Sequence, residues 1–106
     1  MSLETASIDL TGQRAFVTGG GRGIGRAIAV ALAEQGAAVT VIARSPTELE
    51  ETEAMIRSVG GEGESHVADI LDTVALEQAF AAAGEVDLLV NNAGITGPVG
   101  PLQETE

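Results

Sequence analysis

The chain has 106 residues, of which 44% are hydrophobic, and a formal net charge of −11. This length suits one small domain or part of a larger one, and the acidity excludes the basic face that nucleic acids or anionic membranes require. The chain has no cysteine, no signal-like start and no apolar run of about 18 residues. We therefore expect a cytoplasmic protein that binds neither nucleic acid nor membrane.

Apolar runs rich in β-branched residues alternate with segments of helical periodicity. Ser45 and Asp72 stand where N-caps are expected, and Gly36 and Gly60 where helices should end. The expected strands cover residues 14–18, 37–43, 64–69 and 86–90, and the expected helices cover residues 23–35, 46–59 and 73–83. In the first helix the apolar positions Ile24, Ala27, Ile28, Ala31 and Leu32 recur at helical spacing.

This alternation predicts an α/β fold with a Rossmann-type, doubly wound parallel sheet. The four strands should lie in the order 3-2-1-4, with helices on both faces of the sheet. Residues 10–94 should form the core of a single dinucleotide-binding portion that spans 1–106, and residues 95–106 should form a loop tail.

Five glycines between 19 and 25 separate the first strand from the first helix. Unpaired N–H groups at a helix N-terminus favour an anion, and glycines allow a phosphate to approach the backbone closely. The stretch does not fit G-x-G-x-x-G. It does not fit a P-loop either, because Arg26 and Ala27 stand where Lys and Ser/Thr are required. It fits T-G-x-x-x-G-x-G, from Thr18 to Gly25.

With this motif, with Asp69 and Ile70 after the third strand, and with "NNAG" at 91–94, the chain resembles the short-chain dehydrogenases/reductases. The resemblance implies that the glycine turn holds a dinucleotide pyrophosphate, that Asp69 accepts from the adenine amino group and that Ile70 lies against the ring. Asn91 and its neighbours would line the ribose and tie the central strands together. The implied cofactor-binding residues are Gly19, Gly21, Arg22, Gly23, Ile24, Gly25, Arg44, Asp69, Ile70, Asn91, Ala93 and Gly94.

Some of these positions have alternative interpretations. Asp69 would otherwise be a strand-end turn residue, and Asn91 and Asn92 would otherwise be structural caps. Gly20 and Gly21 are expected to be permissive, and Gly21 lacks the hydroxyl that many relatives carry in this turn.

The end of the second strand indicates which dinucleotide binds. A free ribose 2′-hydroxyl is usually recognised by an acid at this point, but Ala43 and Arg44 stand there. A guanidinium binds a 2′-phosphate bidentately, and Arg22 adds a second cation. A charge pair at 4 Å contributes about 4 kcal/mol at an effective dielectric near 20 and about 1 kcal/mol in water. The predicted cofactor is therefore NADP(H) rather than NAD(H), unless both arginines are solvated or paired with glutamates.

The family's hydride transfer uses Ser, Tyr and Lys beyond the fourth strand, and this chain contains no Tyr and no Lys. The resemblance thus implies the cofactor-binding part of an NADPH-linked reductase of carbonyls or oxidase of alcohols, truncated before its catalytic half and homo-oligomeric when complete. We predict no catalytic residue and no metal ligand here. One alternative is a non-catalytic dinucleotide-binding or interaction module. A methyltransferase is disfavoured because the acids that it needs are absent.

Overall fold

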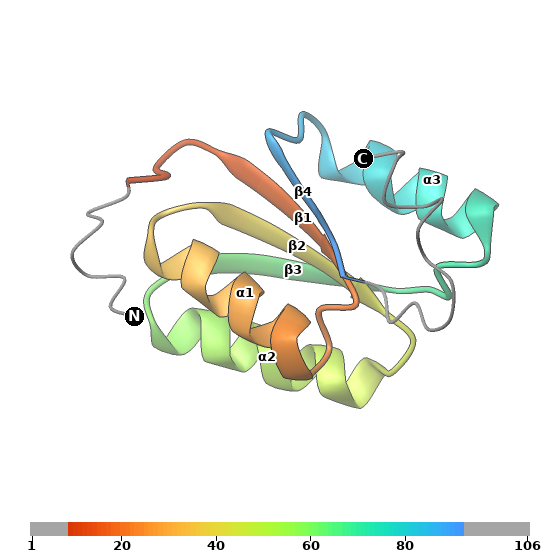
Figure 1. Ribbon diagram of the computed structural model, residues 1–106, viewed down its shortest axis with the longest axis horizontal. Coiled ribbons are helices and arrows are strands. Elements are labelled where there is room, and N and C mark those ends of the chain that lie inside the picture. The colour runs from red at the N-terminus through yellow and green to blue at the C-terminus, as the bar shows by residue number, and fades with distance from the viewer. Residues whose placement is uncertain (1–8, 93–106) are drawn as a thin grey trace.

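The computed structural model describes residues 9–92 (Figure 1). Strands and helices alternate strictly along the chain, and the predicted α/β class is confirmed. The elements are β1 (Arg14–Thr18), α1 (Gly23–Glu34), β2 (Ala38–Ala43), α2 (Pro46–Ser58), β3 (Glu62–Val67), α3 (Thr73–Ala83) and β4 (Leu88–Asn91).

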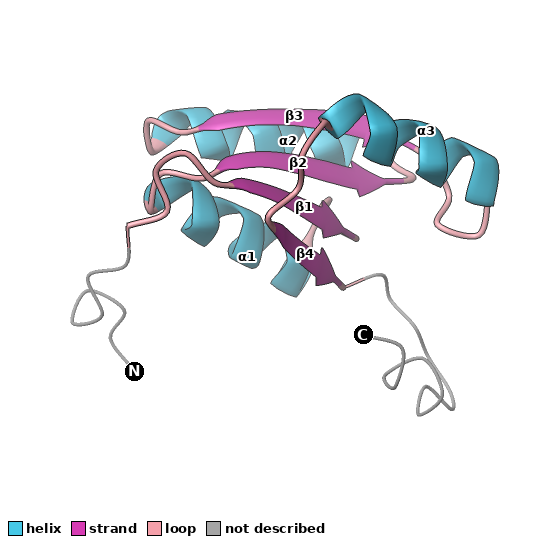
Figure 2. Cartoon of the chain, turned by 90° about the horizontal axis from the view of Figure 1, so that it is seen from above, coloured by secondary structure: helices cyan, strands magenta, loops and turns pink. Residues whose placement is uncertain are grey.

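All four strands are parallel, in the predicted order β3-β2-β1-β4. Val17 at the centre of β1 pairs with Val41 of β2 on one side and with Val90 of β4 on the other. Helices α1 and α2 lie side by side on one face of the sheet, and α3 lies on the opposite face (Figures 1 and 2). This is the doubly wound arrangement, in which the carboxyl ends of the strands share one edge.

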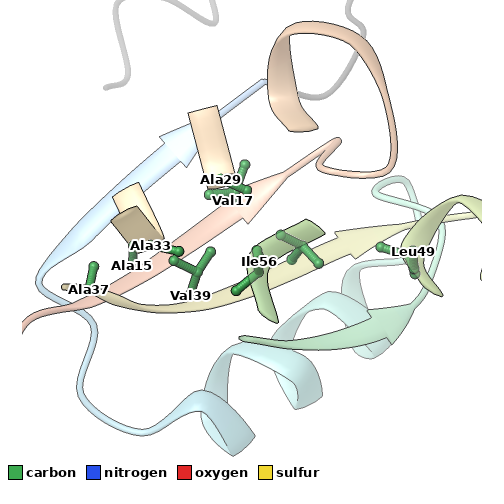
Figure 3. Close-up of a cluster of buried hydrophobic side chains, with 9 residues drawn as sticks. Ala15, Val17, Ala29, Ala33, Ala37, Val39, Leu49 and Ile56 are labelled. Carbon is green, nitrogen blue, oxygen red and sulfur yellow. The ribbon is translucent and has the colours of Figure 1, made fainter. Parts of the chain in front are cut away.

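Two apolar cores lie between the sheet and the helices, one on each face. The larger core lies between the sheet and the α1–α2 layer, and it is built from small and branched aliphatic side chains (Figure 3). Its labelled members are Ala15, Val17, Ala29, Ala33, Ala37, Val39, Leu49 and Ile56. The smaller core, under α3, centres on fully buried Phe16, whose ring meets that of Phe80 edge-on at a centroid distance of 5.1 Å.

The predicted capping residues begin two of the helices. The Ser45 hydroxyl accepts a hydrogen bond from the N–H of Glu48 at 3.2 Å, and Asp72 Oδ1 accepts one from the N–H of Ala75 at 3.1 Å. Both satisfy N–H groups that a helix leaves unpaired at its start. Gly36 follows α1 with φ +104°, a conformation that glycine adopts without the penalty of a Cβ.

The fully buried face of α1 is offset by one position from Ile24, Ile28 and Leu32, the larger residues that recur at helical spacing. The buried residues are Gly25, Ala29 and Ala33, whereas Ile24 is 71% exposed and Ala27 is also exposed. The three buried residues are spaced four apart, as on one face of a helix, but the more prominent pattern of larger apolar residues hides this spacing in the sequence. A face of glycine and alanine lets the helix axis approach the sheet more closely than isoleucine would allow.

Strands β3 and β4 also differ from the prediction. Strand β3 begins at Glu62, two residues earlier than expected, and it includes Gly63. A Cβ on Gly63 would lie 2.9 Å from Cδ1 of Ile56, so the packing of α2 on the strand leaves room only for a glycine at this position. Strand β4 begins at Leu88, two residues later than expected, and the carboxylate of the preceding Asp87 accepts from the N–H of Arg14 at 2.8 Å.

The expected loop tail, 95–106, lies outside the described residues. Within 9–92, no helix is both long enough and apolar enough to cross a membrane.

Candidate functional site

The glycine turn lies at the carboxyl end of β1, between β1 and α1. Strand β1 is flanked by β2, which follows it in sequence, and by β4, which is reached by a crossover. The strand order therefore reverses between β1 and β4, and ligands of open α/β sheets bind beside such a reversal. The turn lies where a ligand site is expected.

Two glycines give the turn its backbone path. Gly19 has φ +70° and Gly23 has φ +61°, values that residues with a Cβ rarely adopt. The N–H of Gly19 donates to the carbonyl of Ile42 at 2.9 Å, which anchors the turn to β2. Gly25 serves packing: a Cβ on it would lie 2.0 Å from the carbonyl oxygen of Gly19.

The expectation that Gly20 is permissive was wrong. A Cβ on Gly20 would lie 2.8 Å from both Cβ and Cγ1 of Val41, whose side chain is fully buried in the larger core. Gly21 is tight but less restricted, with the nearest atoms, the Cβ atoms of Ala43 and Glu48, 3.2 Å away. The turn packs against β2 on its inner side, a contact that the linear motif does not reveal.

The outer side of the turn presents backbone donors. Within residues 9–92, the N–H groups of Gly21, Arg22, Gly23 and Ile24 have no hydrogen-bond acceptor. They stand at the start of α1, where the helix dipole adds about half a positive charge, and the space around a Cβ on Gly23 is open. Free donors, positive potential and open space are what phosphate groups need, so the residues present fit the phosphates of a dinucleotide.

The two arginines predicted to select the cofactor are exposed. Arg22 is the N-cap residue of α1 and makes no capping hydrogen bond through its side chain, and Arg44 directly follows β2. The ion pairs among residues 9–92 join Arg26 to Glu51 and Arg57 to Glu53. In that part of the chain, the proposed pairing of Arg22 or Arg44 with glutamates does not occur.

A buried polar cluster behind the turn was missed in the sequence. Thr52 of α2 is fully buried, and its hydroxyl donates to the carbonyl of Gly20 at 2.9 Å. Arg26 of α1 donates from Nε to that hydroxyl at 3.0 Å and from Nη2 to the carbonyl of Gly21. A signal was present, because Thr52 lies three residues after Leu49 and four before Ile56, on the buried face of α2.

Asp69 and Ile70 follow β3 as predicted, and they have separate surroundings. Asp69 Oδ1 accepts from the N–H of Leu71 at 2.9 Å, the geometry of an Asx turn. The turn-residue interpretation of Asp69 therefore describes what it does in this structure. Ile70 lines an apolar groove of about 390 Å³ between α3 and the sheet, together with Phe16, Leu76, Phe80 and Leu89.

Asn91 and Asn92 join β4 to β1. The Thr18 hydroxyl donates to Asn91 Oδ1 at 3.0 Å and accepts from the N–H of Asn92 at 2.9 Å. The amide nitrogen of Asn92 would lie 2.7 Å from a Cβ on Gly25. The predicted strand-tying role of this motif is thus present, whereas Ala93 and Gly94 lie outside the described residues.

The fold and the glycine turn define a Rossmann-type domain, and comparison with known proteins gives its family. Residues 13–106 match the sequence model of the family described as short chain dehydrogenase. The chain belongs to this family of NAD(P)-dependent oxidoreductases.

Curated relatives support this membership. The chain is 46% identical over 88 residues to the D-erythrulose reductase of Gallus gallus, an alignment that covers 83% of this chain and 34% of the relative. It is 42% identical over 97 residues to the short-chain dehydrogenase/reductase homolog YusS of Bacillus subtilis, covering 87% of this chain and 88% of that protein. The chain spans about a third of the length of the reductases that it matches.

Solved structures share the fold. A putative short-chain alcohol dehydrogenase from Sinorhizobium meliloti is 46% identical, with a TM-score of 0.74 over 84% of this chain and 37% of that one. The carveol dehydrogenase of Mycobacterium avium, solved with NAD, is 28% identical, with a TM-score of 0.77 over 84% of this chain and 38% of that one.

Proposed function

We propose that this chain is the NADP(H)-binding part of a short-chain dehydrogenase/reductase. Gly19, Gly23, Ile24 and Gly25 would hold the pyrophosphate, and Arg22 and Arg44 the ribose 2′-phosphate. Asp69 and Ile70 would take the adenine, and the ribose would lie against Asn91, Ala93 and Gly94. The observation that carries the proposal is the outer side of the turn, where free N–H groups adjoin an exposed arginine.

The preference for the 2′-phosphate rests on charge. Two exposed guanidinium groups facing a dianion favour NADPH by about 1 kcal/mol each when solvated, and by more where water is excluded. The carboxylate of Glu48 opposes this preference: Glu48 Oε1 would lie 3.3 Å from a Cβ on Gly21. Because Arg22 and Arg44 both have side chains free of ion pairs within 9–92, the balance favours the phosphate.

The complete protein would reduce a small carbonyl compound, or oxidise the corresponding alcohol, as a cytoplasmic homo-oligomer. The nicotinamide supplies or accepts the hydride when the cofactor is bound. In the family the proton is exchanged by Tyr, supported by Ser and Lys. This chain has no Tyr and no Lys, so its own residues would bind and orient the cofactor without completing catalysis.

Replacing Arg44 tests the proposal. In the full-length protein, Arg44→Ala should raise the dissociation constant for NADPH at least tenfold, about 1.4 kcal/mol, and leave that for NADH nearly unchanged. Arg57→Ala is the control, because it removes another exposed arginine, at the far end of α2. Equal losses for both dinucleotides in Arg44→Ala would contradict the assignment of the 2′-phosphate.

The second candidate is a dinucleotide-binding module without catalysis. Its support is the match to YusS, a relative of which this chain covers 88%, together with the missing Tyr and Lys. Purified chain that binds NADPH but oxidises none with carbonyl substrates would favour it. A coding sequence that continues past Glu106 into Ser and Tyr-x-x-x-Lys would favour the enzyme.

A further inference from the structure

The cluster behind the glycine turn connects three separate segments of the chain. Thr52 bonds the carbonyls of Gly20 and Gly21 at 2.9 and 3.3 Å. Arg26 bonds Thr52 and the carbonyl of Gly21, and its Nη2 also reaches the carbonyl of Glu48 at 3.2 Å and Glu51 Oε1 at 2.9 Å. We call Arg26 and Thr52 the turn clamp. It joins the turn, α1 and the first turns of α2.

The clamp fixes the directions of two peptide groups. Every peptide bond in the described part of the chain is trans, so a carbonyl and the next residue's N–H point in opposite directions. The carbonyl of Gly20 is held toward Thr52, and the N–H of Gly21 therefore points away from the clamp. The carbonyl of Gly21 is held toward Arg26, and the N–H of Arg22 therefore also points away from the clamp. Both N–H groups lack an acceptor within 9–92.

The clamp itself faces inward. Thr52 is fully buried, the Arg26 side chain is mostly buried, and the charge of Arg26 is paired with Glu51. Neither residue is therefore suited to touch a ligand. Their effect passes through the backbone of Gly20 and Gly21, whose glycines would otherwise sample many orientations, including ones that turn a carbonyl oxygen toward the bound anion.

We propose that Arg26 and Thr52 are positioning residues for the 2′-phosphate: they hold the N–H groups of Gly21 and Arg22 ready to donate to it. This inference rests on the proposed NADP(H) preference. It adds that the preference depends on preorganised backbone donors, and not on the side chains of Arg22 and Arg44 alone. A preorganised donor pair binds more tightly because its ordering cost is met during folding.

The test uses adenosine 2′,5′-bisphosphate and adenosine 5′-monophosphate as probes, titrated against the full-length protein by calorimetry. Thr52→Val keeps the shape of the side chain and removes the hydroxyl. It should weaken the binding of the bisphosphate about tenfold, a loss of about 1.4 kcal/mol. The affinity for the monophosphate should change much less. Thr52→Ser restores a hydroxyl and should recover most of the bisphosphate affinity. A merely structural role would lower the melting temperature and leave the ratio of the two affinities unchanged.

The two proposals fail in different ways. If the unaltered protein binds both probes equally, the NADP(H) preference fails, and the positioning role fails with it. If the unaltered protein prefers the bisphosphate and Thr52→Val keeps that preference, only the positioning role is overturned. Should Thr52→Val not fold, Arg26→Lys provides the second variant. A lysine cannot donate to Thr52 and Gly21 with the planar geometry of a guanidinium, and an unchanged preference in it would also overturn the role.

Discussion

Gly25 lies so close to Gly19 that a Cβ on Gly25 would stand 2.0 Å from the carbonyl oxygen of Gly19. The same Cβ would stand 2.7 Å from the side-chain nitrogen of Asn92. One hydrogen atom on Gly25 thus allows the start of α1, the end of β1 and the segment after β4 to meet. The last glycine of the motif is required by packing within the protein, whether or not a cofactor is bound.

Gly25→Ala should therefore destabilise the protein. In an ordinary helix this change stabilises by up to about 1 kcal/mol. Here the contact should reverse the sign and cost about 3 kcal/mol or more, because the carbonyl group of Gly19 belongs to the backbone and cannot turn aside as the Asn92 side chain can. Urea unfolding followed by circular dichroism measures the change. Ala27→Ser, at an exposed position of the same helix, is the control. An unchanged midpoint in Gly25→Ala would contradict the packing argument.

Gly20→Ala and Gly21→Ala should differ in their effects. At Gly20 the added Cβ would meet Cβ and Cγ1 of buried Val41 at 2.8 Å, so overpacking should cost about 1–3 kcal/mol. At Gly21 the nearest atoms, the Cβ atoms of Ala43 and Glu48, are 3.2 Å away, so shifts of a few tenths of an ångström relieve the contacts. The free energy of unfolding should fall clearly for the first variant and much less for the second. The reverse order would contradict the finding that Gly20 is the more restricted of the two glycines.

The sequence predicted the strand order and several element boundaries, because local signals determine them. Thr18 ends a β-branched run, Ser45 and Asp72 are capping residues, and Gly36 takes a positive φ. The turn clamp and the role of Gly20 were not predicted. They depend on residues 21 to 32 positions apart, which meet only when the glycine turn packs against β2 and α2. The buried face of α1, Gly25, Ala29 and Ala33, was not predicted either, since small residues give a weak hydrophobic signal.

Thr18→Val should loosen the connection between β1 and β4. The valine keeps the shape of the threonine and loses the hydroxyl, which accepts from the N–H of Asn92 and donates to Asn91 Oδ1. A partly buried N–H without an acceptor costs about 1–3 kcal/mol, so the melting temperature should fall. Thr18→Ser keeps the oxygen and should lose less. Hydrogen exchange at the N–H of Asn92 gives a local readout: protection that is equal in the valine variant and the unaltered protein would contradict the prediction.

Leu89→Lys should reduce self-association of the 106-residue chain. The two edges of the sheet differ: β3 carries Glu62 and Glu64, charges that discourage pairing with another sheet, whereas β4 reads Leu-Leu-Val-Asn and leaves Leu89 60% exposed beside the apolar groove. A lysine at this edge opposes the approach of a second strand. Val74→Lys is the matched control, since Val74 is 62% exposed but lies on α3. Light scattering at increasing protein concentration should show a smaller mean mass for Leu89→Lys than for the control. Equal masses for the two variants would mean that general hydrophobic exposure, and not the β4 edge, causes the association.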